Sequence, residues 1–458
     1  MKTIRLLAVG AGVGLLLLSC YMMPKGSTGN IAFSTAGSRS ITAGSDVVRV
    51  SLFSVRTVDG NLVGQTLFAF SGGRTYAEGS VGGTIRLTDI PAGTWAVLVA
   101  AGTKDTNGNF VVTDYSWPYA VLTVAPGVDN PVTVTLQKSP VAATGLFGTD
   151  VMGVTQAGTV YAVTPTKLYN VPGITSAGTL PGGVTANGLD AGYAGASPAP
   201  APFIDTNAGV YYYSSGIQSD LAASNPISVL QSTAFTYSGS KIAVFYQNEG
   251  GFGGVSINSG TIGSWTNMDS SKTIPGKPVY DFTVTNASAS PYAYIASKVG
   301  AFQANQTVVE TQGAADNLLT NVTFFKAPDG STILSLSAMG DNTPFYIGTS
   351  AGAWSATLHE TPSFSITGAT KIAETSGDSI IKIAAASGYV AFLSQYNLYI
   401  LNTGSKNVKT YPFYSGLPGQ LTGMAWDGSG TTLYVSGKAD ASMGNLGGLV
   451  AISGAGLP

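Results

Sequence analysis

Short runs of alternating apolar and polar residues recur along most of the chain, separated by Gly, Pro and small polar residues. Val47–Phe53 and Val132–Leu136 show this pattern with many β-branched residues. A period of two indicates half-buried β-strands, whereas no stretch keeps apolar residues at helical spacing for three turns without Gly, Pro or a β-branched run. The pattern therefore predicts an all-β protein.

A turn is expected within the first part of the chain. Pro91 and Gly93 fit a tight turn, and alternate residues of Trp95–Val99 then share one face of the next strand. The phrase Ile90-Pro-Ala-Gly-Thr-Trp95 resembles the hairpin of carboxypeptidase-regulatory-like and prealbumin-like β-sandwiches. The resemblance implies a β-sandwich over residues 30–139, in a family where this domain is usually a spacer or a binding module.

Seven hairpin-like phrases follow, each a strand, a turn of small residues and a second strand. They lie at 158–169, 209–216, 241–255, 292–302, 345–354, 389–400 and 433–450. Seven phrases within residues 146–458 give about 45 residues per unit, the length of one propeller blade. We therefore expect a linker at 140–145 and a C-terminal β-propeller of about seven blades, although six or eight also fit.

The end of the chain carries a family resemblance. Ser415–Ser436, followed by Gly447-Gly-Leu449, resembles the repeat of two-component-regulator-type propellers. Those repeats run Gly-Leu-Pro, an apolar strand, Asp-x-x-Gly, an apolar-aromatic strand and Gly-Leu. Phe345–Gly352 is similar to the second half of that repeat, and the other units match it poorly. The resemblance implies a propeller fold.

The N-terminus has the pattern of an exported lipoprotein. Lys2 and Arg5 precede an apolar run, Leu6–Leu18, which is of secretory length and short for a membrane span. The run closes on Leu17-Leu-Ser-Cys20, which resembles a lipobox. This implies a signal peptide at 1–19, lipidation of Cys20 and a tether at 20–29; the alternative is an ordinary signal peptide with a chance cysteine.

The expected location is the cell envelope, with the chain held on a membrane through its lipid. Acyl chains contribute about 0.8 kcal/mol per buried methylene, so two or three make a lasting anchor. Tyr21 follows the cysteine, so the aspartate that retains lipoproteins in the inner membrane of enteric bacteria is absent. This favours the outer membrane, facing either the periplasm or the cell surface.

Composition and charge narrow the function. Only 10% of residues are charged and the formal net charge is −2, so there is no basic field for nucleic acid. Cys20 is the only cysteine, so no disulfide is expected within the chain. Every arginine lies before residue 87, which excludes the arginine triad that propeller sialidases use to bind a carboxylate.

Catalytic chemistry has few candidate residues. His359 is the only histidine, so a multi-histidine metal site is excluded and a surface or packing role is expected for this residue. Asp205, Asp281 and Asp427 offer scattered carboxylates of the kind that calcium-dependent propeller lactonases use. The alternative function is therefore a calcium-dependent hydrolase or lyase acting on an envelope sugar or lactone at the propeller channel.

One segment resembles the start of a calcium loop. Asp105, Asn107 and Asn109 place oxygen ligands at alternate positions, but Ser116 stands where an acidic residue closes such a loop. Asp-x-Asn-Gly is also a common hairpin turn. No cofactor is expected apart from a structural calcium ion at this segment.

Aromatic residues are the remaining candidates for binding, and packing is the alternative for each. Tyr211, Tyr212 and Tyr213 place rings on both faces of one strand, while Trp354 and Trp426 lie in later units. The Pro-rich segment Tyr193–Pro202 is expected to be a surface loop. We therefore predict a non-enzymatic binding or scaffold lipoprotein whose protein or carbohydrate ligand the sequence does not identify.

Overall fold

The computed structural model describes residues 28–34, 41–58, 61–193, 200–213, 215–219, 323–339, 342–359 and 365–458. Between 232 and 304 it describes the strand segments 232–237, 241–248, 251–258, 266–267, 279–285, 292–297 and 300–304. These residues form strands and four short 3₁₀ turns (Val171–Gly173, Ala373–Thr375, Phe413–Ser415 and Gly454–Gly456), and none forms an α-helix. The predicted all-β class is confirmed. Within the described part, no helix has the length and apolar character needed to span a bilayer.

The chain divides into two compact units. The first comprises residues through Arg56 together with Gly64–Lys138, and the second comprises Thr57–Val63 and Ser139–Pro458. Each unit has its own sheets and its own buried clusters. We therefore describe them one at a time.

Two sheets build the first unit. The smaller has the order β5-β1-β9, and the larger has the order β10-β7-β6-β2-β3, with β4 paired to β2 and β8 paired to β6. The strands are β1 (Thr28–Ser34), β2 (Val47–Val58), β3 (Asn61–Leu67), β4 (Ala77–Ser80), β5 (Thr84–Pro91), β6 (Gly93–Lys104), β7 (Phe110–Ser116), β8 (Ala120–Val124), β9 (Asp129–Val132) and β10 (Leu136–Lys138).

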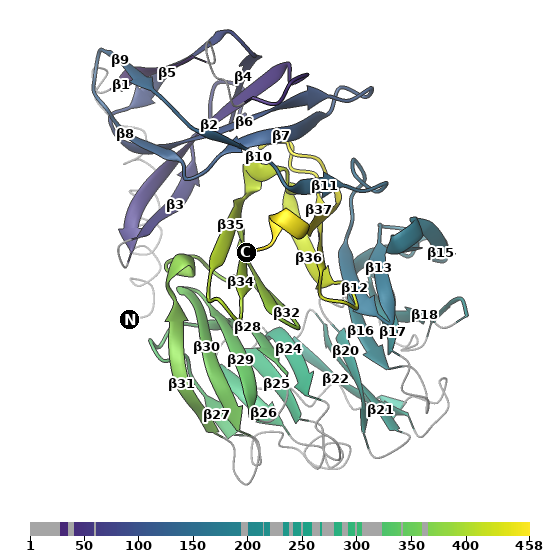
Figure 1. Ribbon diagram of the computed structural model, residues 1–458. Helices are drawn as coiled ribbons and strands as arrows, with labels where there is room; N and C mark the ends of the chain where they lie inside the picture. The colour runs from purple at the N-terminus through teal and green to yellow at the C-terminus, as the bar shows by residue number, and fades with distance from the viewer. Residues whose placement is uncertain are drawn as a thin grey trace, which may run out of the picture. The chain divides into compact units, whose positions relative to one another are not determined.

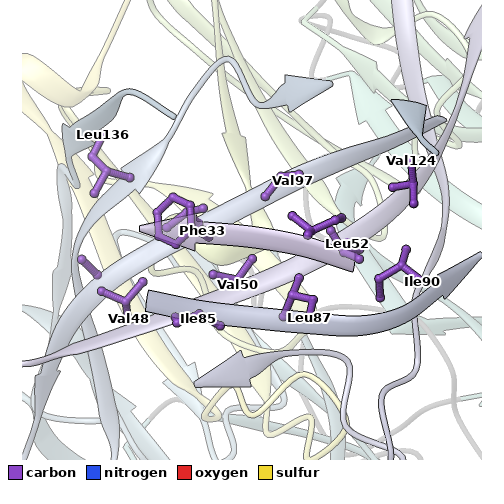
Figure 2. Packing of buried hydrophobic residues seen from close by; sticks show 13 residues of the cluster. Phe33, Val48, Val50, Leu52, Ile85, Leu87, Ile90, Val97, Val124 and Leu136 are labelled. Atoms are coloured by element: carbon purple, nitrogen blue, oxygen red, sulfur yellow. The ribbon is translucent and has the colours of Figure 1, made fainter. Parts of the chain in front are cut away.

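One buried core joins these two sheets. Figure 2 shows Phe33 of β1 and Leu87 of β5 packed against Val50 of β2 and Val97 of β6. Alternate residues of β1, β2, β5 and β6 contribute to this core, as the period of two predicts. Two sheets that share one core have the arrangement of a β-sandwich.

The turn at Pro91 joins the two sheets, so the hairpin expected there is wrong. β5 pairs with β1 in the smaller sheet, whereas β6 begins at Gly93 and pairs in the larger one. Gly93 adopts φ +147°, a conformation that favours glycine. The Trp95 indole N–H donates to the Pro91 carbonyl (2.9 Å), which fixes the chain where it changes sheet.

The single strand expected at Val132–Leu136 is also divided. β9 ends at Val132 in the smaller sheet, and β10 starts at Leu136 in the larger one. Val132, Val134 and Leu136 still face the common core, so the alternation is preserved while the chain passes from one sheet to the other. Apolar alternation does not distinguish a continuous strand from such a crossing.

In the second unit, the described residues form seven four-stranded antiparallel sheets (Figure 1). In chain order the strands of the first three are β12 (Gly153–Ala157), β13 (Thr159–Val163), β14 (Lys167–Asn170) and β15 (Thr175–Thr179); β16 (Ala186–Tyr193), β17 (Pro200–Thr206), β18 (Gly209–Tyr213) and β19 (Ile217–Ser219); and β20 (Ser232–Tyr237), β21 (Lys241–Asn248), β22 (Gly251–Asn258) and β23 (Thr266–Asn267).

The next three sheets follow the same order. They are β24 (Val279–Thr285), β25 (Tyr292–Ser297), β26 (Gly300–Ala304) and β27 (Thr323–Phe325); β28 (Ile333–Ala338), β29 (Thr343–Thr349), β30 (Gly352–His359) and β31 (Ser365–Ile372); and β32 (Lys382–Ala386), β33 (Tyr389–Leu393), β34 (Asn397–Asn402) and β35 (Val408–Pro412).

The seventh sheet combines the two ends of the second unit. Its order is β11-β38-β37-β36, with β11 at Val141–Ala143, β36 at Gln420–Trp426, β37 at Thr432–Lys438 and β38 at Gly448–Ser453. Residues 141–143, which lie in the segment expected to be a linker, thus form an edge strand that pairs with Val450–Ile452.

The first strands of the sheets contact one another in sequence. β12, β16, β20, β24, β28, β32 and β36 each contact the next, and β36 also contacts β12. Small residues permit this close approach. A Cβ atom on Gly153 would lie 2.7 Å from the Leu189 nitrogen, and one on Gly423 would lie 3.2 Å from the Val154 nitrogen. Side chains at these two positions would push neighbouring sheets apart.

The Pro-rich segment predicted to be a loop lies partly in a strand. β17 starts at Pro200 and continues through Pro202. Both prolines pair only with β16, because pairing with β18 begins at Phe203. Proline lacks an N–H and is tolerated where one side of a strand has no partner. The expected loop is therefore wrong for residues 200–202, and residues 194–199 lie outside the described part.

A hydroxyl turn recurs between the second and third strands of four sheets. Thr164, Thr206, Thr349 and Ser394 each donate a side-chain hydrogen bond to the carbonyl of the third residue onward. Two residues further along stand aromatic residues, in equivalent positions of the third strand: Tyr169, Tyr211, Trp354 and Tyr399. Two predicted binding residues, Tyr211 and Trp354, therefore occupy the same position in their sheets.

Candidate functional site

In four sheets of the second unit, the first strand has a β-bulge near its start. The register skips one residue between Ala186 and Gly188 in β16, and the same irregularity recurs in β24, β28 and β36. The skipped residues are Asn187, Tyr280, Leu334 and Thr422. A bulged residue is released from the ladder and its side chain can be aimed away from the sheet.

Three of these skipped residues line one cavity of about 210 Å³, which we call the first-strand cavity. Its walls come from the starts of β12, β16, β24, β32 and β36, with one residue from β17. They are formed by Met152, Asn187, Gly188, Leu189, Asp190, Asp205, Tyr280, Asp281, Ile381, Lys382 and Thr422. Strands far apart in sequence thus contribute equivalent positions to one polar space.

The carboxylates of the first-strand cavity are only partly those expected. Asp205 and Asp281 line it together, as the sequence suggested for a channel, and Asp190 joins them. Asp427 lies elsewhere, in a second cavity of about 360 Å³ lined also by Gln156, Ala384–Ser387 and Trp426. Within the described residues, no three Asp, Glu, His or Cys side chains are grouped closely enough to hold a metal ion.

Side chains at these strand starts also bind neighbouring sheets together. The Leu336 N–H of β28 donates to Asp281 Oδ2 of β24 (2.8 Å), and this bond is buried. The Thr422 hydroxyl of β36 donates to the Val151 carbonyl just before β12 (2.7 Å). Asp281 therefore has a structural role as well as a place in the cavity wall.

Lys382 brings the one positive charge among the described residues that line this cavity. No ion pair joins its ammonium group to a carboxylate of any described residue, although three aspartates line the same space. Ile381 beside it is 44% exposed, which is unusual for a large apolar side chain among the described residues. The cavity thus presents opposite charges and an apolar surface.

The three consecutive tyrosines contribute mainly to packing. Tyr211 and Tyr212 are buried, and Tyr213 is half-buried with its ring 5.9 Å from that of Tyr161. The Tyr212 ring lies 6.0 Å from Phe203 on the neighbouring strand. Among the three, only Tyr213 keeps a substantial exposed surface.

The two predicted tryptophans differ in their partners. Trp426 is buried, stacks on Tyr389 with ring centroids 5.6 Å apart, and donates its indole N–H to the Ala384 carbonyl (3.0 Å). Trp354 is half-buried under the Lys371 ammonium, 5.9 Å from its ring centroid. Its buried indole nitrogen has no hydrogen-bond partner among the described residues.

Asp427 closes its own turn. Its Oδ1 accepts the backbone N–H of Thr431 (2.8 Å) and of Thr432 (3.2 Å), and its Oδ2 accepts the Ser429 hydroxyl (3.0 Å). Burial alone raises the pKa of Asp427, but these hydrogen bonds outweigh it and leave the pKa below its ordinary value. The carboxylate is thus held ionised as part of the turn.

The segment with a calcium-loop resemblance is the turn between β6 and β7. Asp105 Oδ1 accepts the backbone N–H groups of Asn107 and Asn109 (both 2.8 Å), and Oδ2 accepts the Asn109 side-chain amide (3.0 Å). The bonds from Asn109 lower the pKa of the Asp105 carboxyl. Calcium binding by these three residues stays a prediction.

His359 ends β30 between two neutral groups. Its Nδ1 lies 2.7 Å from Asn342 Oδ1, and its Nε2 lies 3.0 Å from the Thr367 hydroxyl. Both contacts are exposed. The hydroxyl–imidazole–amide order has the spacing of a nucleophile, a base and an orienting group, but at an open edge without water exclusion. The contacts fix the imidazole between Asn342, directly before β29, and Thr367 of β31.

Several lining residues were missed by the sequence reasoning. Asn187, Asp190, Tyr280, Lys382 and Thr422 were not singled out, because the seven phrases covered mainly second and third strands. A signal exists: in Met152-Gly153, Asn187-Gly188 and Thr422-Gly423 a lining residue precedes a glycine that is closely packed against a neighbouring strand. Cys20, the predicted lipidation site, lies outside the described residues.

No protein-family model matches the chain, and no curated protein matches it either. Among solved structures, PorZ, a surface component of the type-IX secretion system of Porphyromonas gingivalis, is 12% identical with a TM-score of 0.41. The match covers 68% of this chain and 37% of PorZ.

Extracellular domains of putative hybrid two-component systems from B. thetaiotaomicron also match. One is 16% identical with a TM-score of 0.43, covering 67% of this chain and 40% of the other. A second is 9% identical with a TM-score of 0.45, covering 78% and 55%. The chain thus spans less than two thirds of each of these three structures. Similarity at this level assigns neither a family nor a function.

Proposed function

We propose that the second unit is a seven-bladed β-propeller and that the protein is a non-enzymatic binding protein of the cell envelope. The contacts of the first strands in cyclic order support the propeller. The seventh sheet supports it too, because β11 from the start of the unit completes a sheet formed by its last strands. Such an arrangement joins the two ends of a ring.

The first-strand cavity carries the binding role. Bulges at the starts of several first strands direct polar side chains into one small space, and convergence of a few polar groups in a concave site is typical of ligand binding. Asp281 supports binding over catalysis, because one of its oxygens already accepts a backbone N–H of the next sheet.

A thermal-shift screen of the full chain against amino acids, sugars, nucleotides and short peptides tests this role. Asn187→Trp should fill the cavity and abolish the shift caused by its ligand. Ser405→Trp, in an exposed turn after β34, should leave that shift unchanged. A shift that survives Asn187→Trp contradicts the site. Conversion of the ligand into a product, detected by mass spectrometry, would favour the calcium-dependent hydrolase or lyase instead.

We further propose that Cys20 is lipidated and anchors the chain to an envelope membrane. The outer membrane is favoured over the inner membrane, because Tyr21 stands where inner-membrane retention in enteric bacteria uses an aspartate. The support is the pattern of residues 1–20: a charged start, an apolar run and a lipobox-like end. In this arrangement the sandwich serves as a spacer, and the propeller carries the ligand.

A further inference from the structure

We infer that the second cavity is a binding site for a small neutral molecule that carries an acetamido group. This cavity holds about 360 Å³, within the usual range of about 300–1,000 Å³ for ligand pockets. Its walls come from the ends of β12, β32 and β36 and from the turns that follow β32 and β36. They are formed by Gln156, Ala384, Ala385, Ala386, Ser387, Met424, Ala425, Trp426, Asp427, Gly428, Ser429 and Gly430.

The second cavity is separate from the first-strand cavity. The first-strand cavity is lined by the starts of β12, β32 and β36, whereas the second cavity is lined by the ends of the same three strands. β36 contacts both β32 and β12. The second cavity therefore has β12 on one side of the end of β36 and β32 on the other.

The charge of the lining favours an uncharged ligand. Among the described residues of this lining, Asp427 is the only one with an ionisable side chain. Its carboxylate accepts hydrogen bonds from the Thr431 and Thr432 backbone N–H groups and from the Ser429 hydroxyl, all within its own turn. No lysine or arginine of the described lining is present to hold an anionic ligand.

Gln156 supplies a hydrogen-bond donor from the β12 side. The residue is half-buried, and its side-chain amide forms no hydrogen bond with any residue in the described part of the chain. A Cβ atom on Gly428 would lie 3.6 Å from Gln156 Nε2, so this amide nitrogen reaches the turn after β36. Its N–H groups are available to a carbonyl oxygen of a ligand.

Ser387 supplies an acceptor from the β32 side. This exposed residue follows β32 directly, and its hydroxyl likewise has no hydrogen bond to a described residue. The C=O and N–H of a secondary amide are trans and point in opposite directions. One acetamido group therefore accepts from Gln156 with its oxygen and donates to Ser387 with its nitrogen, bridging the two sides.

The apolar lining matches the methyl part of an acetamido group. Ala384–Ala386 are half-buried, so part of their surface is open in the cavity beside Met424 and Trp426. The Trp426 N–H is already bonded to the Ala384 carbonyl, which leaves this part of the wall without a free indole donor. An apolar surface with a few placed polar groups is typical of a ligand site.

Calorimetric titration of the full chain with three probes tests the inference. N-acetylglucosamine and N-acetyl-L-alanine methylamide carry the acetamido group on a sugar and on an amino acid, and glucose lacks it. We expect one of the two acetamido probes to bind about tenfold more tightly than glucose, because two hydrogen bonds and a methyl contact are gained. The tighter probe identifies the source of the group. Glucose binding as tightly as both, or no binding of either, would overturn the inference.

Variants of the two sides locate the bound probe. Gln156→Ala and Ser387→Ala should each weaken its binding severalfold, and Ala385→Leu should block it by filling the cavity. Gln395→Ala, at an exposed glutamine outside the cavity, is the matched control and should bind as the unchanged chain does. Unchanged affinity in both Gln156→Ala and Ala385→Leu would overturn the site. Thermal unfolding of each variant without ligand verifies that it is folded.

This inference and the proposed role of the first-strand cavity can fail separately. A response that survives Asn187→Trp and is lost in Gln156→Ala supports the second cavity, and the first-strand cavity is then judged with ligands whose response does not depend on Gln156. A response that is lost in Asn187→Trp and retained in Gln156→Ala would overturn this inference and support the first-strand cavity.

Discussion

Trp426 and Trp354 differ in the hydrogen bonding of their indole nitrogens. Only the Trp426 indole N–H has a carbonyl partner, and that partner belongs to another sheet. We expect Trp426→Phe to lower the free energy of unfolding by about 1 kcal/mol more than Trp354→Phe, because only the former removes a hydrogen bond. Chemical denaturation of both variants measures this difference, and equal losses would contradict the assigned hydrogen bond.

Asp281 offers a matched pair of substitutions. Asp281→Ala leaves the buried Leu336 N–H without an acceptor and should cost about 1–3 kcal/mol. Asp281→Asn retains an oxygen acceptor and should cost clearly less. Denaturant midpoints for the two variants provide the comparison. If Asn were as damaging as Ala, the loss would come from charge and not from the hydrogen bond.

Tyr115 gives the first unit an alkaline sensitivity. Burial raises the pKa of Tyr115 to about 12, against a small opposing effect of a hydrogen bond with Gln137. A folded pKa above the unfolded value near 10 means that this stabilisation is complete below pH 10 and is lost as pH rises toward 12. Melting temperatures between pH 8 and 12 should fall less steeply for Tyr115→Phe. An unchanged slope would contradict the raised pKa.

The sequence indicated which residues were candidates for binding, but not which of them are buried and which line a cavity. Tyr211, Tyr212 and Tyr213 were expected to place rings on both faces of one strand, with packing as the alternative for each. β18 lies between two strands, Tyr211 and Tyr212 are buried, and only Tyr213 stays partly exposed. Burial on both faces depends on neighbouring sheets, which alternation within one strand does not reveal. Lys382 gave no signal at all, because its significance lies in residues from other sheets.

At the scale of elements, the three-residue strand β11 is expected to contribute strongly to stability for its length. Replacing Val141-Ala142-Ala143 by three glycines should remove about 2 kcal/mol, through lost strand preference and the lost packing of Val141. Hydrogen exchange of residues 450–452, which pair with β11, should accelerate. Ser405→Gly in an exposed turn is the control; protection of β38 unchanged by the triple substitution would contradict its dependence on β11.

Most strands were predictable because each hairpin carries its own turn residues and alternation. Six of the seven phrases fall on the second and third strands of a sheet, whereas 209–216 covers only the third strand of its sheet, β18, and ends before β19 begins at Ile217. The second strand of that sheet, β17, was not recognised because its prolines indicated a loop. Pairings between distant segments, such as Val141 with Ile452, leave no local signal.

For the whole molecule, the decisive expectation concerns the proposed anchor. Cys20→Ala should move the protein from the membrane fraction to a soluble exported fraction, because the thiol that carries the acyl chains is gone. Fractionation followed by immunodetection measures this. Ser19→Ala, which retains the thiol, is the matched control and should stay with the membrane. Firm membrane association of Cys20→Ala would show that another feature holds the chain there.

At the bulged positions of the first strands, the residues that line the cavity differ from the residues that determine strand pairing and packing. Asn187, Tyr280 and Thr422 are skipped by the ladder pairing, so their side chains do not determine which residues of β16, β24 and β36 face their partners. The glycines that follow Asn187 and Thr422 meet the steric demand of neighbouring strands instead. Mutation at the bulged sites can therefore alter ligand preference while strand register is retained, which allows a single scaffold to diversify in specificity without passing through misfolded intermediates.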